Sequence, residues 1–208
     1  MVVVVGVGSG CASHGAIACC GGTAVTEITF EGFPKIARLS RECIITEKID
    51  GTNAQVIITD DVLNAQVAAG SRTRLITPDD DNYGFARWVK EHEDELRKGL
   101  GPGRHFGEWW GQKIQRGYGL TEKRFSLFNT TRWTAENVPS CCHVVPELYR
   151  GEFDTPVVRV ALLELETYGS KAAPGFMRPE GVVIFHTAGN YLFKKTLEKD
   201  EAPKGQQA

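Results

Sequence analysis

The segment from Cys43 to Thr59 is the part of the sequence that most constrains the fold. It is rich in β-branched residues that partly alternate with polar ones, and it is interrupted once, at Asp50-Gly51. Branched side chains favour strands, and an Asp-Gly pair between two apolar runs marks a tight turn. The segment therefore predicts two short strands with a turn between them.

Two segments show the periodicity of a helix. Apolar residues at helical spacing predict a helix over residues 83–98, which Gly99 ends. A second helix is expected to begin at Thr155-Pro156, with Thr155 as N-cap and the proline at the first helical position. We expect it to end near Gly169.

Three further strands are expected. A third strand is expected from Leu63 to Ala68, and the runs 181–186 and 191–195 predict a hairpin joined by residues 187–190. The sequence shows no internal repeat. The expected fold class is α+β, with antiparallel sheets and two principal flanking helices.

Size and charge set broad limits. The chain has 208 residues, of which 41% are hydrophobic, so it can bury a sizeable core as one domain. The formal net charge is −2, so any surface that binds a polyanion must be a local patch. No stretch approaches the roughly 18 to 20 apolar residues of a membrane span, and the N-terminus lacks the basic start of a signal peptide. We expect a cytoplasmic protein with no membrane partner.

Residues 1–24 differ in texture from the rest of the chain. They contain six glycines and three cysteines but no charged side chain. Gly6, Gly8 and Gly10 are similar to part of a dinucleotide-binding loop, but the third glycine comes one place too early and no helical pattern follows. We therefore expect a disordered leader over 1–24, one globular domain over 25–200 and a flexible tail over 201–208.

The six cysteines do not form a zinc-ribbon pattern, because none shows the C-x-x-C spacing. A zinc site built from Cys141, Cys142, His143 and the N-terminal thiols is conceivable. Reduced thiols in a cytoplasmic protein are the favoured interpretation.

The segment Thr46–Asn53 carries the most informative chemistry. Lys48 lies at the end of the first predicted strand, and Asp50, two residues later, points to the same face in an extended chain. Gly51 allows the backbone to approach a ligand closely. A surface hairpin is the alternative interpretation of this short Lys-x-Asp-Gly pattern on its own.

Five further segments follow Lys48 in order. They are Gly70-Ser71-Arg72, Phe106-Gly107-Glu108-Trp109, Phe125-Ser126-Leu127-Phe128, Pro179-Glu180-Gly181-Val182-Val183 and Phe193-Lys194-Lys195. Together with Thr46–Asn53 they resemble the successive motifs of the covalent nucleotidyltransferase superfamily, which comprises ATP-dependent DNA ligases, RNA ligases and mRNA capping enzymes. The segments 46–53 and 107–111 are most similar to the RNA ligase branch, particularly its compact phage-type members.

The resemblance covers about residues 26–200 and implies both a fold and a reaction. The fold is a ligase-type nucleotidyltransferase domain, similar to ATP-grasp, over residues 25–200. In the reaction, Lys48 attacks the α-phosphate of ATP and forms lysyl-AMP. AMP then passes to a 5′-phosphate and is expelled when a 3′-hydroxyl attacks. A lysine nucleophile must be neutral, whereas an unperturbed lysine has a pKa of about 10.4, so nearby cations are expected to activate it.

The resemblance also implies which residues bind the nucleotide. Glu108 is expected to hold the ribose hydroxyls, and Phe125 to stack on the base, although Phe125 could instead be a core residue. Arg72 is favoured over Arg74 for the ribose or the incoming phosphate. Glu47, or its backbone, is expected to read the purine edge. Gly51 and Asn53 complete the expected nucleotide-binding set.

The resemblance assigns Glu180 to a metal ion, Mg²⁺ or Mn²⁺, because magnesium binds hard oxygens with few protein ligands. Lys194 and Lys195 are the expected activating cations, and Asp50 is expected to act in the later steps. The family pattern is Lys-x-Lys, whereas neighbouring residues in a strand point to opposite faces. Lys194 is the preferred partner, with Thr196 in place of the second lysine, and Lys195 is the alternative.

Residues 104–133 contain six basic residues against two acidic ones, interleaved with seven aromatic residues. This combination suits a groove that tracks phosphates and stacks bases. The expected nucleic-acid surface comprises Lys113, Arg116, Lys123 and Arg124. A solvated loop beside core aromatic residues is the alternative.

The leading hypothesis is an ATP-dependent polynucleotide ligase whose partners are strand ends of RNA, or of DNA. An ATP-dependent DNA ligase and a GTP-dependent capping-type guanylyltransferase are the alternative enzymes, and a degenerate nucleotide- or RNA-binding module is the alternative without turnover. Only 13 residues follow Lys195, so we expect a bare catalytic domain that works with a separate accessory domain or protein.

Overall fold

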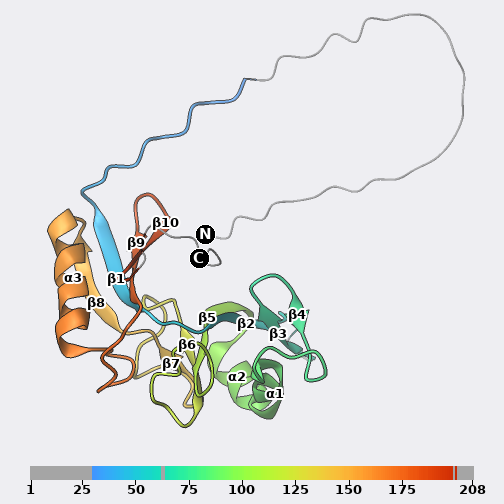
Figure 1. The fold of residues 1–208 in the computed structure, drawn as a ribbon. Coiled ribbons are helices and arrows are strands. Elements are labelled where there is room, and N and C mark those ends of the chain that lie inside the picture. The colour runs from blue at the N-terminus through green and yellow to red at the C-terminus, as the bar shows by residue number, and fades with distance from the viewer. Residues whose placement is uncertain (1–29, 62–63, 199, 201–208) are drawn as a thin grey trace, which may run out of the picture. The chain divides into compact units, whose positions relative to one another are not determined.

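The computed structural model describes residues 30–61, 64–198 and 200, and the expected leader and tail lie outside them. The chain divides into two compact units, one ending at Ile36 and the other beginning at Ala37. Every helix and strand described below belongs to the second unit (Figure 1).

Four strands form an antiparallel sheet in the order β10-β9-β1-β8. Their bounds are β1 Glu42–Lys48, β8 Glu147–Glu152, β9 Gly181–His186 and β10 Tyr191–Thr196. The expected hairpin of β9 and β10 is confirmed. It places the C-terminal strand two positions from β1 although almost 150 residues separate them in sequence.

Six strands form the second sheet, in the order β4-β3-β2-β5-β6-β7. Their bounds are β2 Thr52–Ile58, β3 Val67–Ser71, β4 Leu75–Ile76, β5 Gly103–Gly111, β6 Lys123–Leu127 and β7 His143–Val144. The third strand thus begins four residues later than the sequence predicts. Only the pairing of β6 with β7 is parallel within the described residues, so the sheets are antiparallel with one exception.

The first two strands do not pair with each other. β1 pairs with β8 and β9, whereas β2 pairs with β3 and β5, so residues 49–51 carry the chain from one sheet to the other. Ile49 is buried in a small cluster that includes Trp110, Tyr118 and Val145. Burial of this apolar side chain stabilises the position of residues 49–51. The turn of a simple hairpin would instead have been exposed to solvent.

Helices cover one face of each sheet. α3, Thr155–Tyr168, buries Ala161, Leu162 and Leu165 against the four-stranded sheet (Figure 1). Its bounds agree with the expected helix, except that Asp154 is the N-cap and Thr155 is already helical.

The other expected helix, over 83–98, consists of two helices. α1 spans Phe85–Glu91 and α2 spans Glu93–Leu100, with His92 between them in a non-helical conformation. The backbone amide and the ring Nδ1 of His92 both lie within hydrogen-bonding distance of the Trp88 carbonyl, at 3.0 and 2.8 Å. Both helices pack on the six-stranded sheet in the largest apolar cluster.

Truncation of Leu165 should test how far the four-stranded sheet depends on α3. Leu165 is fully buried, whereas Leu163 on the same helix is 60% exposed. We expect Leu165→Ala to lower the free energy of unfolding by about 2 to 5 kcal/mol, because it leaves a cavity. Leu163→Ala should change it by less than about 0.5 kcal/mol. Urea denaturation measures both, and equal effects would contradict this account of the core.

Candidate active site

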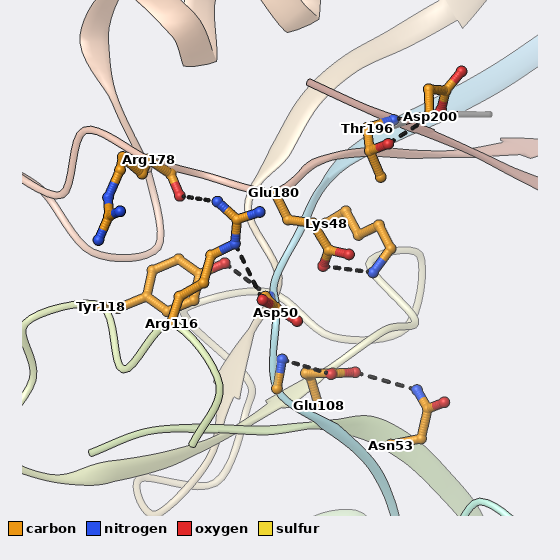
Figure 2. Close-up of polar contacts among 11 residues, drawn as sticks. Lys48, Asp50, Asn53, Glu108, Arg116, Tyr118, Arg178, Glu180, Thr196 and Asp200 are labelled. Carbon is orange, nitrogen blue, oxygen red and sulfur yellow. Dashed lines mark hydrogen bonds and ion pairs between the residues drawn. The ribbon is translucent and has the colours of Figure 1, made fainter. Parts of the chain in front are cut away.

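Lys48 and Glu180 form an ion pair at the ends of two neighbouring strands (Figure 2). Lys48 is the last residue of β1, and its Nζ donates to Glu180 Oε2 at 2.6 Å. Both side chains are mostly buried, with 18% and 6% exposed. Gly181, which follows Glu180, has φ 151° and its Cα lies so close to Lys195 that a Cβ would be 2.2 Å from the carbonyl oxygen. A glycine is therefore required where the chain turns into β9.

Glu108 belongs to the six-stranded sheet and lies on the other side of Asp50 from this pair (Figure 2). It lies opposite Asn53 in the pairing of β5 with β2. Its two carboxylate oxygens accept hydrogen bonds from the Gly51 amide at 3.0 Å and from Asn53 Nδ2 at 3.2 Å (Figure 2). A Cβ on Gly51 would lie 2.5 Å from the Trp109 carbonyl oxygen, so the glycine allows close packing against β5. Gly51 and Asn53 thus hold Glu108 in place.

Asp50 lies between the two glutamates in the chain crossing. Its carboxylate accepts a hydrogen bond from Arg116 Nε at 3.1 Å, and its amide donates to the Tyr118 hydroxyl at 2.8 Å (Figure 2). Arg116 also donates to the Arg178 carbonyl at 3.0 Å. Burial is the main reason that the pKa of Tyr118 is raised, so its hydroxyl stays protonated. These contacts fix Asp50 from two directions.

Lys194 and Thr196 lie on the face of the four-stranded sheet that carries Lys48. In the register of β10 with β9, Thr196 is opposite Gly181, which is itself opposite Lys48 in β1. Lys194, two residues earlier, has the same orientation. Lys195 points to the other face and its Nζ donates to Asp200 Oδ2 at 2.8 Å. The register thus favours Lys194 over Lys195 as the residue that faces the site.

Phe125 does not lie where a base could stack on it. It is fully buried on the opposite face of the six-stranded sheet from Glu108, with its ring centroid 5.0 Å from that of Phe85. Strand alternation explains the difference, because Ser126 pairs with Glu108 whereas Phe125 pairs with Trp109. Phe128, two residues beyond Ser126, is 42% exposed. The expected stacking role for Phe125 is therefore wrong. Of the aromatic residues in this segment, Phe128 is the one expected on the same side as Ser126 and Glu108.

The Glu47 side chain is also unavailable to a base. It is 1% exposed and accepts hydrogen bonds from Ser170 Oγ at 2.5 Å and from the amides of Lys171 and Ala172 at 2.8 and 2.9 Å. Burial raises the pKa of Glu47 despite the opposing effect of these hydrogen bonds. The carboxyl group anchors the loop after α3, so a direct role of this side chain in base recognition is corrected. A role for the Glu47 backbone stays a prediction.

Arg72 and Arg74 differ in their engagement. Arg74 lies in the turn between β3 and β4 and forms an ion pair with Asp80, which follows β4. Arg72 is exposed in that turn and makes no hydrogen bond or ion pair with the described part of the chain. Arg72 is thus the one of the two whose guanidinium is available, which agrees with the preference from the sequence.

The four basic residues expected to bind nucleic acid are not gathered on one surface. Lys123 and Arg124 are neighbours in β6 and point to opposite faces, because Lys123 donates to the Tyr83 carbonyl at 2.6 Å whereas the Arg124 guanidinium lies 5.9 Å from the centre of the Trp110 ring. Arg116 pairs with Asp50, and Lys113 is exposed. Arg116 and Arg124 therefore lie on the side of Glu108 and Trp110, and Lys123 lies on the other.

Several partners of the site were not predicted from the sequence. They are Tyr118, Ser170, Arg178 and Asp200. The Gly117-Tyr118-Gly119 triplet was a usable signal, because all three residues adopt positive φ and such a run marks a tight turn. Ser170 and Arg178 contact residues far away in sequence, whereas Asp200 contacts Lys195 and Thr196 just before it, and no local pattern marks any of the three.

No metal cluster is formed by three or more His, Cys, Asp or Glu side chains among the described residues. The conceivable zinc site at Cys141–His143 is therefore not assembled within that part of the chain, and its N-terminal thiols lie outside it. Within the same residues, no helix is long and apolar enough to cross a membrane.

The sequence matches the model of the RNA ligase family over residues 41–196. The chain belongs to the RNA ligase family. The matched span contains β1 through β10 and, apart from Asp200, the residues of the site described above. No curated protein matches the sequence significantly.

Solved structures of an RNA ligase from Naegleria gruberi share the fold. A variant without ligand has a TM-score of 0.53 and 20% sequence identity over 76% of this chain and 50% of that one. A complex with AMP and Mn gives 0.52 and 19% over 76% and 50%, and one with ATP and Mn gives 0.53 and 20% over 74% and 48%. This family member thus spans about half the length of the ligase structures that it matches.

Replacement of Glu47 should test whether its carboxyl group is structural. We expect Glu47→Ala to lower the free energy of unfolding by about 3 kcal/mol, because it leaves a buried hydroxyl and two amides without an acceptor. Arg72→Ala, at an exposed position, should change it by less than about 0.5 kcal/mol. Chemical denaturation followed by tryptophan fluorescence measures both. Unchanged stability of Glu47→Ala would argue against the anchoring role.

Proposed function

We propose that the chain is the catalytic domain of an ATP-dependent polynucleotide ligase, acting on RNA in preference to DNA through a covalent lysyl-AMP intermediate. The observation that carries the proposal is the mostly buried Lys48–Glu180 pair, set opposite Glu108 within the span that matches the RNA ligase family. A lysine held beside a carboxylate at a strand end has a fixed position, which a nucleophile needs in order to meet a bound phosphate.

In the first step, the neutral Lys48 amine attacks the α-phosphate of ATP, a phosphoramide bond forms and pyrophosphate leaves. Glu180, 2.6 Å from the Lys48 Nζ, holds the amine in place at the end of β1 before the nucleotide binds. A cation bound at Glu180 would supply positive charge that competes with Lys48 for this carboxylate. Lys194, which has the same orientation in the sheet as Lys48, adds positive charge that offsets the phosphate charge.

The divalent cation is proposed to be Mg²⁺ or Mn²⁺. Magnesium takes one or two carboxylates and completes its shell with phosphates and water, so a site without a three-residue cluster fits it. Glu180 supplies hard oxygens at the place where the phosphates meet Lys48. The cation supplies neutralisation of the phosphate charge. The Naegleria gruberi ligase has been solved with ATP and Mn, which supports the choice of nucleotide and of metal.

The remaining site residues are proposed to position the nucleotide and the strand ends. Glu108, held by Gly51 and Asn53, is the proposed acceptor for the ribose hydroxyls. Arg72 is proposed to contact the ribose or the incoming phosphate. Asp50 and its partner Arg116 are proposed to act when AMP passes to a 5′-phosphate and a 3′-hydroxyl displaces it.

The RNA strand is proposed to approach along the side of the sheet that carries Arg116 and Arg124, with the exposed Lys113 as a further basic contact. Because the chain spans about half the length of the matched ligase structures, we also propose that a separate domain or protein assists end joining.

The described thiols of Cys43, Cys141 and Cys142 are all free, which supports a reducing, cytoplasmic location.

Incubation with α-labelled ATP and Mg²⁺ tests the nucleophile. We expect an acid-labile label on the protein that Lys48→Ala loses completely, because the Lys48 amine, paired with Glu180, is the proposed nucleophile. Glu166→Ala, at an exposed position of α3, is the control and should label normally. Label that persists in Lys48→Ala would show another nucleophile, and label from GTP alone would show a capping-type enzyme. No label from either would favour a binding module.

Comparison of Lys194→Ala with Lys195→Ala tests the register of β10. We expect Lys194→Ala to slow lysyl-AMP formation by about a hundredfold, because it removes a cation from the reacting phosphate. Lys195→Ala breaks an exposed ion pair with Asp200 and should change the rate by less than about fivefold. Single-turnover labelling measures both rates. The reverse order would mean that Lys195 is the partner of Lys48.

A further inference from the structure

Cys141 and Cys142 are sequence neighbours whose thiol groups lie against each other. Their Sγ atoms are 3.8 Å apart and share a hydrogen bond. Cys142 is buried in the largest apolar cluster, at 3% exposed, whereas Cys141 is partly exposed. Neither thiol has a role in the proposed ligase reaction, and the third described cysteine, Cys43, lies in a different apolar cluster.

The turn that carries the two thiols is held on both sides. The Cys142 amide donates to the Pro139 carbonyl at 2.8 Å, which closes the turn. The Cys141 amide and the Ser140 hydroxyl both donate to Glu95 of α2, at 2.8 and 2.5 Å. These contacts limit the freedom of the backbone around Cys141, so the two thiols remain close to each other.

We propose that Cys141 and Cys142 are a modification site for low-molecular-weight disulfides, which convert the two thiols into a reversible Cys141–Cys142 disulfide. The partly exposed Cys141 attacks first, as its thiolate, on one sulfur of a disulfide such as oxidised glutathione. A mixed disulfide forms and one glutathione leaves. Cys142 then attacks the Cys141 sulfur, its proton passes to the departing thiolate, and the second glutathione leaves. The two cysteines lose two electrons and two protons, and the oxidised glutathione gains them.

The order of attack follows from the surroundings of the two thiols. The hydrogen bond with Cys141, together with burial, raises the pKa of Cys142, so Cys142 is the poorer initial nucleophile. It is nevertheless in position to resolve the mixed disulfide, because its sulfur already touches that of Cys141. Attack by the exposed thiol and resolution by the buried one is therefore the favoured sequence.

A disulfide between neighbouring residues should be easy to reduce. Consecutive Cα atoms are about 3.8 Å apart across a trans peptide, which is shorter than the usual range of about 4.4 to 6.8 Å in disulfides. The ring is therefore strained, and strained disulfides are the labile ones. Such a bond is suited to reversible modification. A permanent structural disulfide would be expected to have little strain.

The position of the pair connects it to the site. β7 begins directly after Cys142, its residues pair with β6, and the Val145 amide donates to the Leu127 carbonyl at 3.1 Å. Val145 is buried in one cluster with Ile49, the residue after Lys48. Contacts between packed residues therefore connect Cys141 and Cys142 to the chain crossing, so a distortion at the two cysteines can reach residues 49–51. We infer that the disulfide slows lysyl-AMP formation, and this part of the inference rests on the proposed function.

Mass spectrometry after incubation with oxidised glutathione tests the modification. Trypsin releases residues 133–150 as one peptide, in which Cys141 and Cys142 are the only cysteines. We expect this peptide to lose two hydrogen atoms and to regain them with dithiothreitol. The peptide from Cys141→Ser should not lose them, whereas Cys43→Ala, which alters the unrelated buried thiol, should behave as the unmodified protein. An unchanged peptide, or one with a stable glutathione adduct, would overturn the proposal.

The rate of Lys48 labelling from ATP, measured on the same samples, tests the link to the site. We expect oxidation to slow labelling by about fivefold in the unmodified protein and in Cys43→Ala, and to leave Cys141→Ser unaffected. If the disulfide forms and labelling is unchanged, the link is wrong. If reduced protein does not label at all, the proposed function fails, and the mass measurement still decides whether the two thiols form a disulfide.

Discussion

The crossing of the chain from one sheet to the other at residues 49–51 is the constraint on which the site depends. β1 ends at Lys48 and β2 begins at Thr52, so three residues must span the gap. Burial of Ile49 fixes the start of the crossing, and the Gly51 amide is tied to Glu108 at its end. Lys48, at the end of an inner strand of one sheet, and Glu108, in a strand of the other, are therefore held in a constant relation.

Side-chain alternation along each strand decides which residues face the site. Glu47 and Lys48 are neighbours that point to opposite faces of β1, one towards the loop after α3 and the other towards Glu180. Glu47 anchors one face of β1 to the loop after α3, and Lys48 places its amine on the other face. The same alternation in β10 separates Lys194 from Lys195, and in β6 it separates Phe125 from Ser126.

Local pattern predicted α3 and the strands β1, β2, β3, β9 and β10, but it did not predict β4 to β8, and it indicated little about which strands pair. The bounds of α3 and of the β9–β10 hairpin follow from a helix start at Thr155-Pro156 and from two apolar runs around a short loop. The separation of β1 from β2 was not visible, because the pairing partners of β1 lie more than 100 residues away. For Phe125, alternation was readable from the sequence, but which face packs on helices depends on α1. Glu47 was misjudged because its acceptor role involves backbone amides of residues 171 and 172, and backbone amides carry no sequence signature.

The ion pair between Lys48 and Glu180 has a consequence for the protein at rest. The Lys48 side chain is only 18% exposed and its Nζ lies 2.6 Å from Glu180 Oε2, so electrophiles such as cyanate or acyl phosphates have little access to the nitrogen. Acylation of this amine would destroy the proposed nucleophile. The contact with Glu180 therefore also shields that nitrogen from chance chemical modification.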